Sequence, residues 1–148
     1  MLKGKLLHPE ILGALASAGH LATILIADGN YPSGTKPNPR AKIIWANFTS
    51  GVVDACTMLR LISGLVPVEV VTVMAPAKSG QYAMAGDPPI WQEYRKILRE
   101  TADFRGDFLQ LQKPEFNRET RSEDLALVIA TAETQIYANI LITVGVVQ

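Results

Sequence analysis

Four side chains of this 148-residue chain could move protons around a small polar ligand. His20 carries an imidazole, which titrates near neutral pH and can therefore both accept and donate a proton. Tyr137 carries a phenol whose higher reference pKa favours donation. Asp28 and Asn139 supply a carboxylate and an amide that could hold hydroxyl groups. These residue types indicate acid–base chemistry, or binding alone, on a ligand without strong charge.

Each of these residues also has an ordinary structural explanation. A histidine just after the helix-ending Gly19, or a Tyr and an Asn just before a strand, more often serves in a turn or in packing. One strand separates His20 from Asp28, so their meeting would require an adjacent strand or a neighbouring subunit. We expect His8 to be exposed and structural, and Cys56 to be a buried thiol in an apolar stretch.

Other chemistries lack their patterns in this sequence. Two distant histidines and one cysteine do not provide a transition-metal set at a familiar spacing. The segment Asp28-Gly29-Asn30 resembles the start of a calcium loop, but Tyr31-Pro32 breaks that pattern. The chain contains no Gly-x-Gly-x-x-Gly run, no P-loop and no Gly-x-Ser-x-Gly elbow. We therefore expect neither a metal nor a cofactor.

Composition narrows the class of partner. Fourteen basic residues cancel fourteen acidic ones, which gives no electrostatic basis for binding nucleic acid or an anionic membrane. The chain has no apolar run long enough to span a bilayer, and charged residues interrupt its first apolar stretch. We therefore expect a single cytoplasmic domain over residues 1–148 that takes a small neutral ligand.

Turn signals and apolar runs predict the elements that position these residues. We expect four helices: Pro9–Ala18, Gly51–Ser63, one that begins at Pro88, and Glu115–Asp124. Ser50 and Asp87 are the expected N-caps of the second and third helices. Gly19 is expected to be left-handed after the first helix. The expected strands are Thr23–Ala27, Lys42–Trp45, Val68–Met74, Asp107–Leu111, Leu125–Ala130 and Asn139–Val144.

The alternation of helices and apolar strands predicts an α/β layered domain with a largely parallel sheet. In such sheets, ligands bind outside the carboxyl ends of the strands. Asp28 stands directly after an expected strand and opens a Gly/Pro-rich loop that continues to about Arg40. This placement marks Asp28 as a ligand-binding candidate.

Taken in order and spacing, several short motifs resemble the RbsD/FucU family of sugar pyranases and mutarotases. They are Leu7-His8-Pro9-Glu10-Ile11-Leu12, Gly19-His20, Ala27-Asp28, Ala130-Thr131-Ala132-Glu133, Tyr137-Ala138-Asn139-Ile140-Leu141 and Gly145-Val146. The resemblance implies a three-layer α/β/α domain and a cofactor-independent isomerase that opens and recloses the ring of a free monosaccharide. It also implies pentamer-based rings, commonly decamers, with sites at subunit contacts.

The same resemblance assigns roles to residues of this chain. It implies His20 and Tyr137 as catalytic, and Asp28, Asn139, Glu115 and Ala138 as sugar-binding. Glu115 departs from the pattern, because fucose mutarotases look to carry an Arg there and ribose pyranases a His. Arg118 or Arg121 could take over that contact if the local loop shifts.

Two motifs bear on the branch of the family, and they point to different branches. The stretch Pro89-Ile90-Trp91-Gln92-Glu93-Tyr94 is similar to an insertion of the fucose-mutarotase branch, whereas Tyr137-Ala138-Asn139 is closer to the ribose branch. We predict a mutarotase for L-fucose or a related aldose. The alternatives are a D-ribose pyranase and a non-catalytic sugar-binding transport accessory protein. A nucleotide-binding α/β protein is disfavoured, because no glycine-rich phosphate loop follows a strand.

Overall fold

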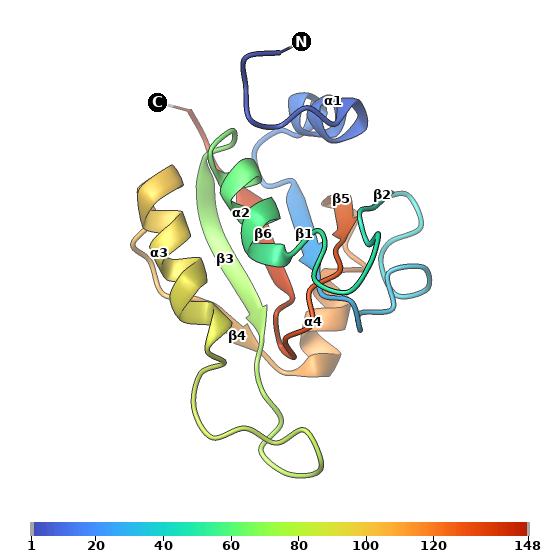
Figure 1. Cartoon of the computed structure of the whole chain (residues 1–148), viewed down its shortest axis with the longest axis vertical. Coiled ribbons are helices and arrows are strands. Elements are labelled where there is room, and N and C mark those ends of the chain that lie inside the picture. The colour runs from blue at the N-terminus through green and yellow to red at the C-terminus, as the bar shows by residue number, and fades with distance from the viewer. Residues whose placement is uncertain (1, 148) are drawn as a thin grey trace.

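Six strands form one sheet with helices on both of its faces in the computed structural model, which describes residues 2–147 (Figure 1). The helices are α1 (Pro9–Ser17), α2 (Ala55–Ser63), α3 (Ile90–Ala102) and α4 (Lys113–Glu119). The strands are β1 (Thr23–Ala27), β2 (Lys42–Trp45), β3 (Val68–Met74), β4 (Leu109–Leu111), β5 (Leu125–Ala130) and β6 (Ile140–Val144).

The direction of β6 decides which segments meet. The strands are ordered β2-β5-β1-β6-β3-β4, and β6 is antiparallel to both of its neighbours, whereas the other pairs are parallel. The expected largely parallel sheet is therefore confirmed, with one reversed strand at its centre. Because β6 is reversed, its first residue, Ile140, pairs with Ile26 near the carboxyl end of β1.

Two apolar layers enclose the sheet, since successive side chains of a strand point to opposite faces. Ile24 and Ile26 of β1 pack on one face in the core that contains α1, α2 and α3. Leu25 and Ala27 pack on the other face with Phe116 of α4. Figure 1 shows α2 and α3 on the near side of the sheet and α4 behind it. This arrangement confirms the three-layer α/β/α prediction.

The expected start and cap of α2 were wrong. Asp54, not Ser50, caps this helix, because its side chain accepts a hydrogen bond from the Thr57 N–H at 2.7 Å. Gly51 has a φ of 79°, and Thr49 pairs with Val52 in an isolated bridge. This tight turn keeps residues 49–52 out of the helix.

The predicted cap of α3 and the predicted left-handed glycine were also wrong. Asp87 does not cap α3; its carboxylate accepts from Arg95 Nη2 at 2.8 Å instead. After α1, the left-handed residue is Leu21, with a φ of 69°, and not Gly19. Leu21 holds this conformation while its N–H donates to the Val144 carbonyl at 2.9 Å.

The remaining bounds differ by a few residues. The helix α4 begins two residues before the predicted start, at Lys113, because Pro114 suits a first helical turn. It ends at Glu119, and the strand β4 is limited to Leu109–Leu111. Within residues 2–147, no helix has the length and apolar character needed to cross a membrane.

One buried hydrogen bond between α3 and the start of β6 offers a test of this packing. The Tyr94 hydroxyl donates to the Ala138 carbonyl at 2.7 Å, and both residues are fully buried. We expect Tyr94→Phe to lower the free energy of unfolding by about 1–3 kcal/mol, because it leaves a buried carbonyl without its donor. Chemical denaturation measures this loss. The exposed Tyr82 is the matched control, and a loss in Y82F equal to that in Y94F would contradict the assignment.

Candidate functional site

Four segments meet at the edge of the sheet where the parallel strands end. Asp28 follows β1, residues 131–133 follow β5, residues 75–77 follow β3, and Tyr137 to Asn139 precede the reversed β6. We name this the carboxyl edge. In Figure 1 it lies at the bottom, where the long loop between β3 and α3 projects, whereas both termini lie at the top. The edge matches the position at which open α/β sheets bind ligands.

Asp28 and Asn139 hold each other through two hydrogen bonds. The Asn139 side-chain amide donates to Asp28 Oδ2 at 2.8 Å, and its oxygen accepts from the Asp28 N–H at 2.9 Å. Both residues are about 95% buried. Asp28 Oδ1 accepts a further bond from the Asn30 N–H at 2.9 Å. Both residues were predicted from the sequence to be ligand contacts, and the fold joins them into one polar pair.

The environment of the Asp28 carboxyl raises its pKa above the usual value of 3.8. Burial is the largest cause, because a carboxylate loses its hydration there. The Glu133 carboxylate acts in the same direction, and backbone N–H groups oppose both effects. A buried acid with a perturbed pKa at a strand end is a typical functional-site feature.

The Tyr137 hydroxyl is bound on two sides by the loop that follows β3. It accepts from the Ala77 N–H at 3.0 Å and donates to the Tyr82 carbonyl at 2.7 Å. A phenol oxygen has a second lone pair, so it can still accept from a ligand. To give its proton to a ligand, it would have to turn away from the Tyr82 carbonyl.

The backbone of Tyr137 is strained, with a φ of 60°. A non-glycine residue in this region costs on the order of 1–3 kcal/mol and persists only where its surroundings fix it. Two donors of α3 fix it here: Trp91 Nε1 donates to the Tyr137 carbonyl at 3.0 Å, and the Tyr94 hydroxyl donates to the next carbonyl. The aromatic face of α3 therefore determines where the phenol points.

Ala138 lies between these groups and is fully buried. Its carbonyl accepts from Tyr94, and its N–H acts on the Asp28 carboxyl. The structure thus places Ala138 beside the predicted site residues, with its polar groups already engaged by protein.

His20 lies at the opposite edge of the sheet, before β1, and we name this the amino edge. His20 Nε2 lies 2.9 Å from Glu69 Oε2, near the start of β3. A carboxylate can only accept, so Nε2 donates, and Nδ1 is left as the basic nitrogen of the neutral ring. Both side chains are nearly half exposed, at 47% and 44%. The pair therefore contributes little to stability, about 0–1 kcal/mol.

The fold does not bring His20 together with Asp28 and Tyr137 within one protomer. The five residues of β1 alone span about 16 Å, and His20 lies beyond one end of β1 while Asp28 follows the other. From the sequence, a contact between His20 and Asp28 was expected to need an adjacent strand or another subunit. The adjacent strand β6 does not provide it, because its two ends also lie at opposite edges.

Glu115 belongs to α4, on the face of the sheet opposite to α2 and α3. Its Oε1 accepts a long bond of 3.5 Å from Arg118 Nη2. Its Oε2 is buried and has no hydrogen-bond partner among residues 2–147. Because this oxygen is buried within the protomer, the side chain would have to turn outward before a ligand hydroxyl could reach it.

Three features of the site escaped the sequence analysis. Glu69 could have been noticed as a single carboxylate within a valine-rich strand. Glu133 was quoted only as part of a motif, yet it is buried among backbone N–H groups. Trp91 and Tyr94 were named only as part of a motif, and nothing in their spacing shows that they donate hydrogen bonds to the turn before β6.

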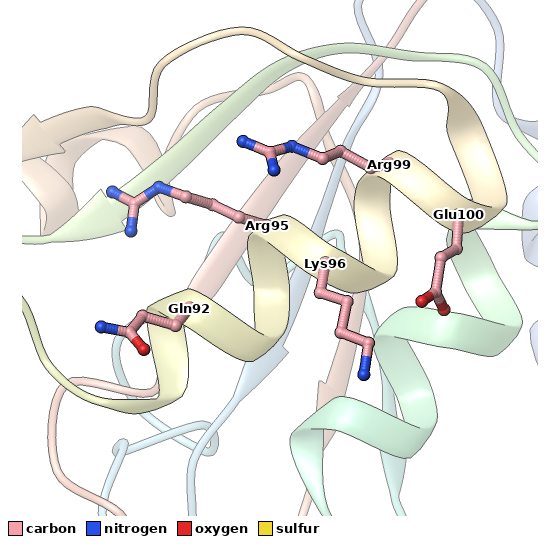
Figure 2. Close-up of a pocket in the computed structure, with 5 residues that line it drawn as sticks. All are labelled: Gln92, Arg95, Lys96, Arg99 and Glu100. Carbon is pink, nitrogen blue, oxygen red and sulfur yellow. The ribbon is translucent and has the colours of Figure 1, made fainter.

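A pocket of about 410 Å³ lies elsewhere, on α3. Figure 2 shows that Arg95 and Arg99 extend to the same side of the helix, while Lys96 and Glu100 point another way. The lining side chains are Gln92, Arg95, Lys96, Arg99 and Glu100. None of them belongs to the carboxyl or the amino edge, so we do not place a sugar here. Across residues 2–147, no three His, Cys, Asp or Glu side chains form a metal-binding group.

Comparison with known proteins gives consistent results over the whole chain. The model of the RbsD / FucU transport protein family matches residues 1–147. The fucose mutarotase of Mus musculus is 31% identical over 151 residues, which cover 97% of this chain and 94% of that protein. The fucose mutarotase of Homo sapiens is also 31% identical, over 98% of this chain and 94% of its own length.

Solved structures share the fold. The fucose mutarotase of Streptococcus pneumoniae, in complex with L-fucose, has a TM-score of 0.80 and 27% identity over 99% of this chain and 100% of that chain. Bacillus subtilis RbsD, complexed with D-ribose, has a TM-score of 0.75 and 25% identity over the full length of both chains. With a family model matched end to end and relatives above 30% identity, this chain belongs to the RbsD/FucU family.

Proposed function

We propose that this protein is a fucose mutarotase, an isomerase that interconverts the anomers of free L-fucose without a cofactor. The observation that carries the proposal is the joining of Asp28, Asn139 and Tyr137 at one edge, in a chain whose relatives over nearly their full length are fucose mutarotases. A ribose pyranase remains the alternative to be tested, because a D-ribose complex has the same fold.

Asp28 and Asn139 fix the sugar in this proposal. The Asp28 carboxylate already accepts from Asn30 and Asn139, and the Ala138 N–H also acts on it, so a sugar hydroxyl would take a lone pair that these donors leave. Glu115 adds an acceptor in this proposal once its side chain turns the buried, unpartnered Oε2 outward. Any contact from Ala138 would go through its backbone. Binding at several hydroxyls would hold the ring where only two protons need to move.

His20 and Tyr137 exchange those protons. His20 Nδ1 takes the proton of the anomeric hydroxyl, the bond between the anomeric carbon and the ring oxygen breaks, and Tyr137 gives its phenol proton to that ring oxygen. The open aldehyde turns about its C1–C2 bond, and the reverse transfers reclose the ring on the other face. General acid–base catalysis of this kind contributes about 10²–10⁴-fold.

The mechanism requires His20 from one protomer and Tyr137 from another. Exposed apolar side chains flank both edges and support such a contact: Leu21 and Val146 near His20, and Tyr82 and Ile136 near Tyr137. Exposed apolar groups of this kind often mark interfaces. A ring-shaped homo-oligomer in the cytoplasm, of pentamers paired into decamers, remains part of the proposal.

Exchange NMR on free sugars tests the function. We expect the wild-type protein to speed exchange between the α and β anomers of L-fucose, and both His20→Gln and Tyr137→Phe to slow it by about 10²–10⁴-fold. Exchange between ribose pyranose and furanose forms that is faster than the fucose reaction would favour a pyranase instead. Sugar binding without accelerated exchange would indicate a binding protein.

A mixture of the two inactive variants tests whether sites are shared between subunits. If H20Q and Y137F chains assemble together at random, about a quarter of the shared sites receive both native side chains. We therefore expect partial recovery of fucose exchange in co-expressed chains. No recovery, in mixtures shown by mass spectrometry to contain both variants in one assembly, would rule out a shared site.

The His20–Glu69 pair makes a separate prediction. We expect Glu69→Gln to lower the exchange rate on the order of 10- to 100-fold, because an amide can donate as well as accept and no longer selects the tautomer that leaves Nδ1 basic. The melting temperature should scarcely change. Glu100→Gln is the control, since Glu100 pairs with Arg60 at 2.8 Å with similar exposure. Equal activities of E69Q and E100Q would contradict a catalytic use of this pair.

The raised pKa of Asp28 leads to a prediction about how sugar binding depends on pH. Because the folded-state pKa is raised, ionising Asp28 lowers the stability of the sugar-free protein as pH rises through that pKa. Fucose offsets part of this loss by donating hydroxyls to the carboxylate. We expect the rise in melting temperature caused by fucose to increase as pH rises through the raised pKa of Asp28. A fucose-induced shift that is constant with pH, or one that keeps its pH dependence in Asp28→Asn, would contradict this role.

A further inference from the structure

Glu133 is a buried carboxylate for which the proposed mechanism has no use. It is 6% exposed and lies in the turn between β5 and β6 that leads to Tyr137. A charged group is seldom buried to this degree unless its oxygens are satisfied by donors. The partners of Glu133 therefore indicate what it holds in place.

The carboxylate of Glu133 joins two separate segments. Oε1 accepts from the Thr134 and Gln135 N–H groups, both at 2.9 Å, and so closes the turn around its own side chain. Oε2 accepts from the N–H of Ala55 at 3.3 Å, at the first residue of α2. The negative charge also suits the positive end of that helix.

The main chain of Glu133 joins a third segment. Its carbonyl accepts from the Gly29 N–H at 2.9 Å, directly after Asp28. Its N–H donates to Thr131 Oγ1 at 3.3 Å, and that hydroxyl donates to the Ala27 carbonyl at 2.7 Å. A Cβ on Gly29 would lie 3.0 Å from the Glu133 carbonyl oxygen, so only glycine permits this approach without a shift.

We propose that Glu133 is a positioning residue, which holds the Asp28 segment, the start of α2 and the turn before Tyr137 in one arrangement so that carboxylate and phenol face the same sugar. Tyr137 lies four residues after Glu133 and two after Gln135, which Glu133 Oε1 fixes. Trp91 and Tyr94 hold this turn from the α3 side, and Glu133 holds it from the α2 side.

The charge of Glu133 has a measurable effect on Asp28 that packing alone would not produce. Its carboxylate helps raise the pKa of Asp28, and burial is the larger cause. On the α3 side, Tyr94 also interacts with the Asp28 charge, but its own pKa is raised far above neutrality by burial, so it stays uncharged. Removing the Glu133 charge should therefore lower the pKa of Asp28 and shift the pH dependence of binding.

The experiment compares Glu133→Gln with Ser63→Ala. Ser63 is a buried polar residue at the other end of α2, where it donates to the Leu59 carbonyl and bonds Thr101. We expect both variants to lose thermal stability. E133Q alone should reduce the fucose exchange rate at saturating sugar, by about 10- to 100-fold. It should also move the acidic limb of sugar binding to lower pH.

Because the activity readout depends on the proposed function, amide hydrogen exchange supplies a readout that does not. We expect E133Q to lose protection at residues 28–30 and 134–139, whereas S63A keeps it. Gly29→Ala retains the carboxylate and should reproduce the loss at both segments, because its Cβ displaces the Glu133 carbonyl.

The two ideas fail in different ways. If wild-type protein exchanges no sugar but E133Q still loosens both segments, the proposed function fails and the positioning role stands. If E133Q leaves amide protection and the pH limb as they are in the wild type, the positioning role is overturned. If E133Q does not fold, unchanged protection of residues 134–139 in G29A overturns the role, and loss of protection there supports it.

Discussion

The two hydrogen bonds between Asp28 and Asn139 are the constraint on which the site depends. They connect the end of β1 to the start of β6, although Asp28 and Asn139 lie 111 positions apart in the chain. A buried carboxylate needs such a partner, because burial without hydrogen bonds is costly. The pair therefore requires β6 to run against its neighbours, and the reversed strand in turn carries Tyr137 to the edge where the other strands end.

The carboxyl edge and the amino edge carry different kinds of polar residues. The carboxyl edge, to which the proposed function assigns the sugar hydroxyls, carries buried polar residues and is built from four segments of one protomer. The other presents an exposed imidazole paired with a carboxylate. A protomer thus carries two unlike sets of polar residues at opposite ends of its strands, and the proposed mechanism requires one set from each of two protomers.

Much of the fold could be predicted from the sequence, because apolar runs and their lengths are local signals. All six strands and four helices lie where β-rich runs and helical spacing placed them, apart from shifts at their ends. The predicted ends of elements were wrong where another residue took the group that the local pattern assigned to a cap. Asp87 looks like a helix cap in the sequence, but an arginine one turn inside the helix takes its carboxylate.

The candidate site was predictable only in part. Asp28 could be found because it directly follows a strand, and Tyr137 and Asn139 because they precede one. The reversed direction of β6 has no local signature, so their convergence with Asp28 could not be derived from spacing. Glu69 and Glu133 were missed for the same reason, since their partners come from distant segments.

The hydrogen bonds between the loop after β3 and the Tyr137 phenol come from main-chain groups, the Ala77 N–H and the Tyr82 carbonyl. Main-chain groups are common to nearly every amino acid, so side chains in this loop can drift without releasing the phenol. Substitutions in this loop can then change the wall around the phenol while the proposed proton donor keeps its position. A scaffold arranged in this way is well placed to diversify.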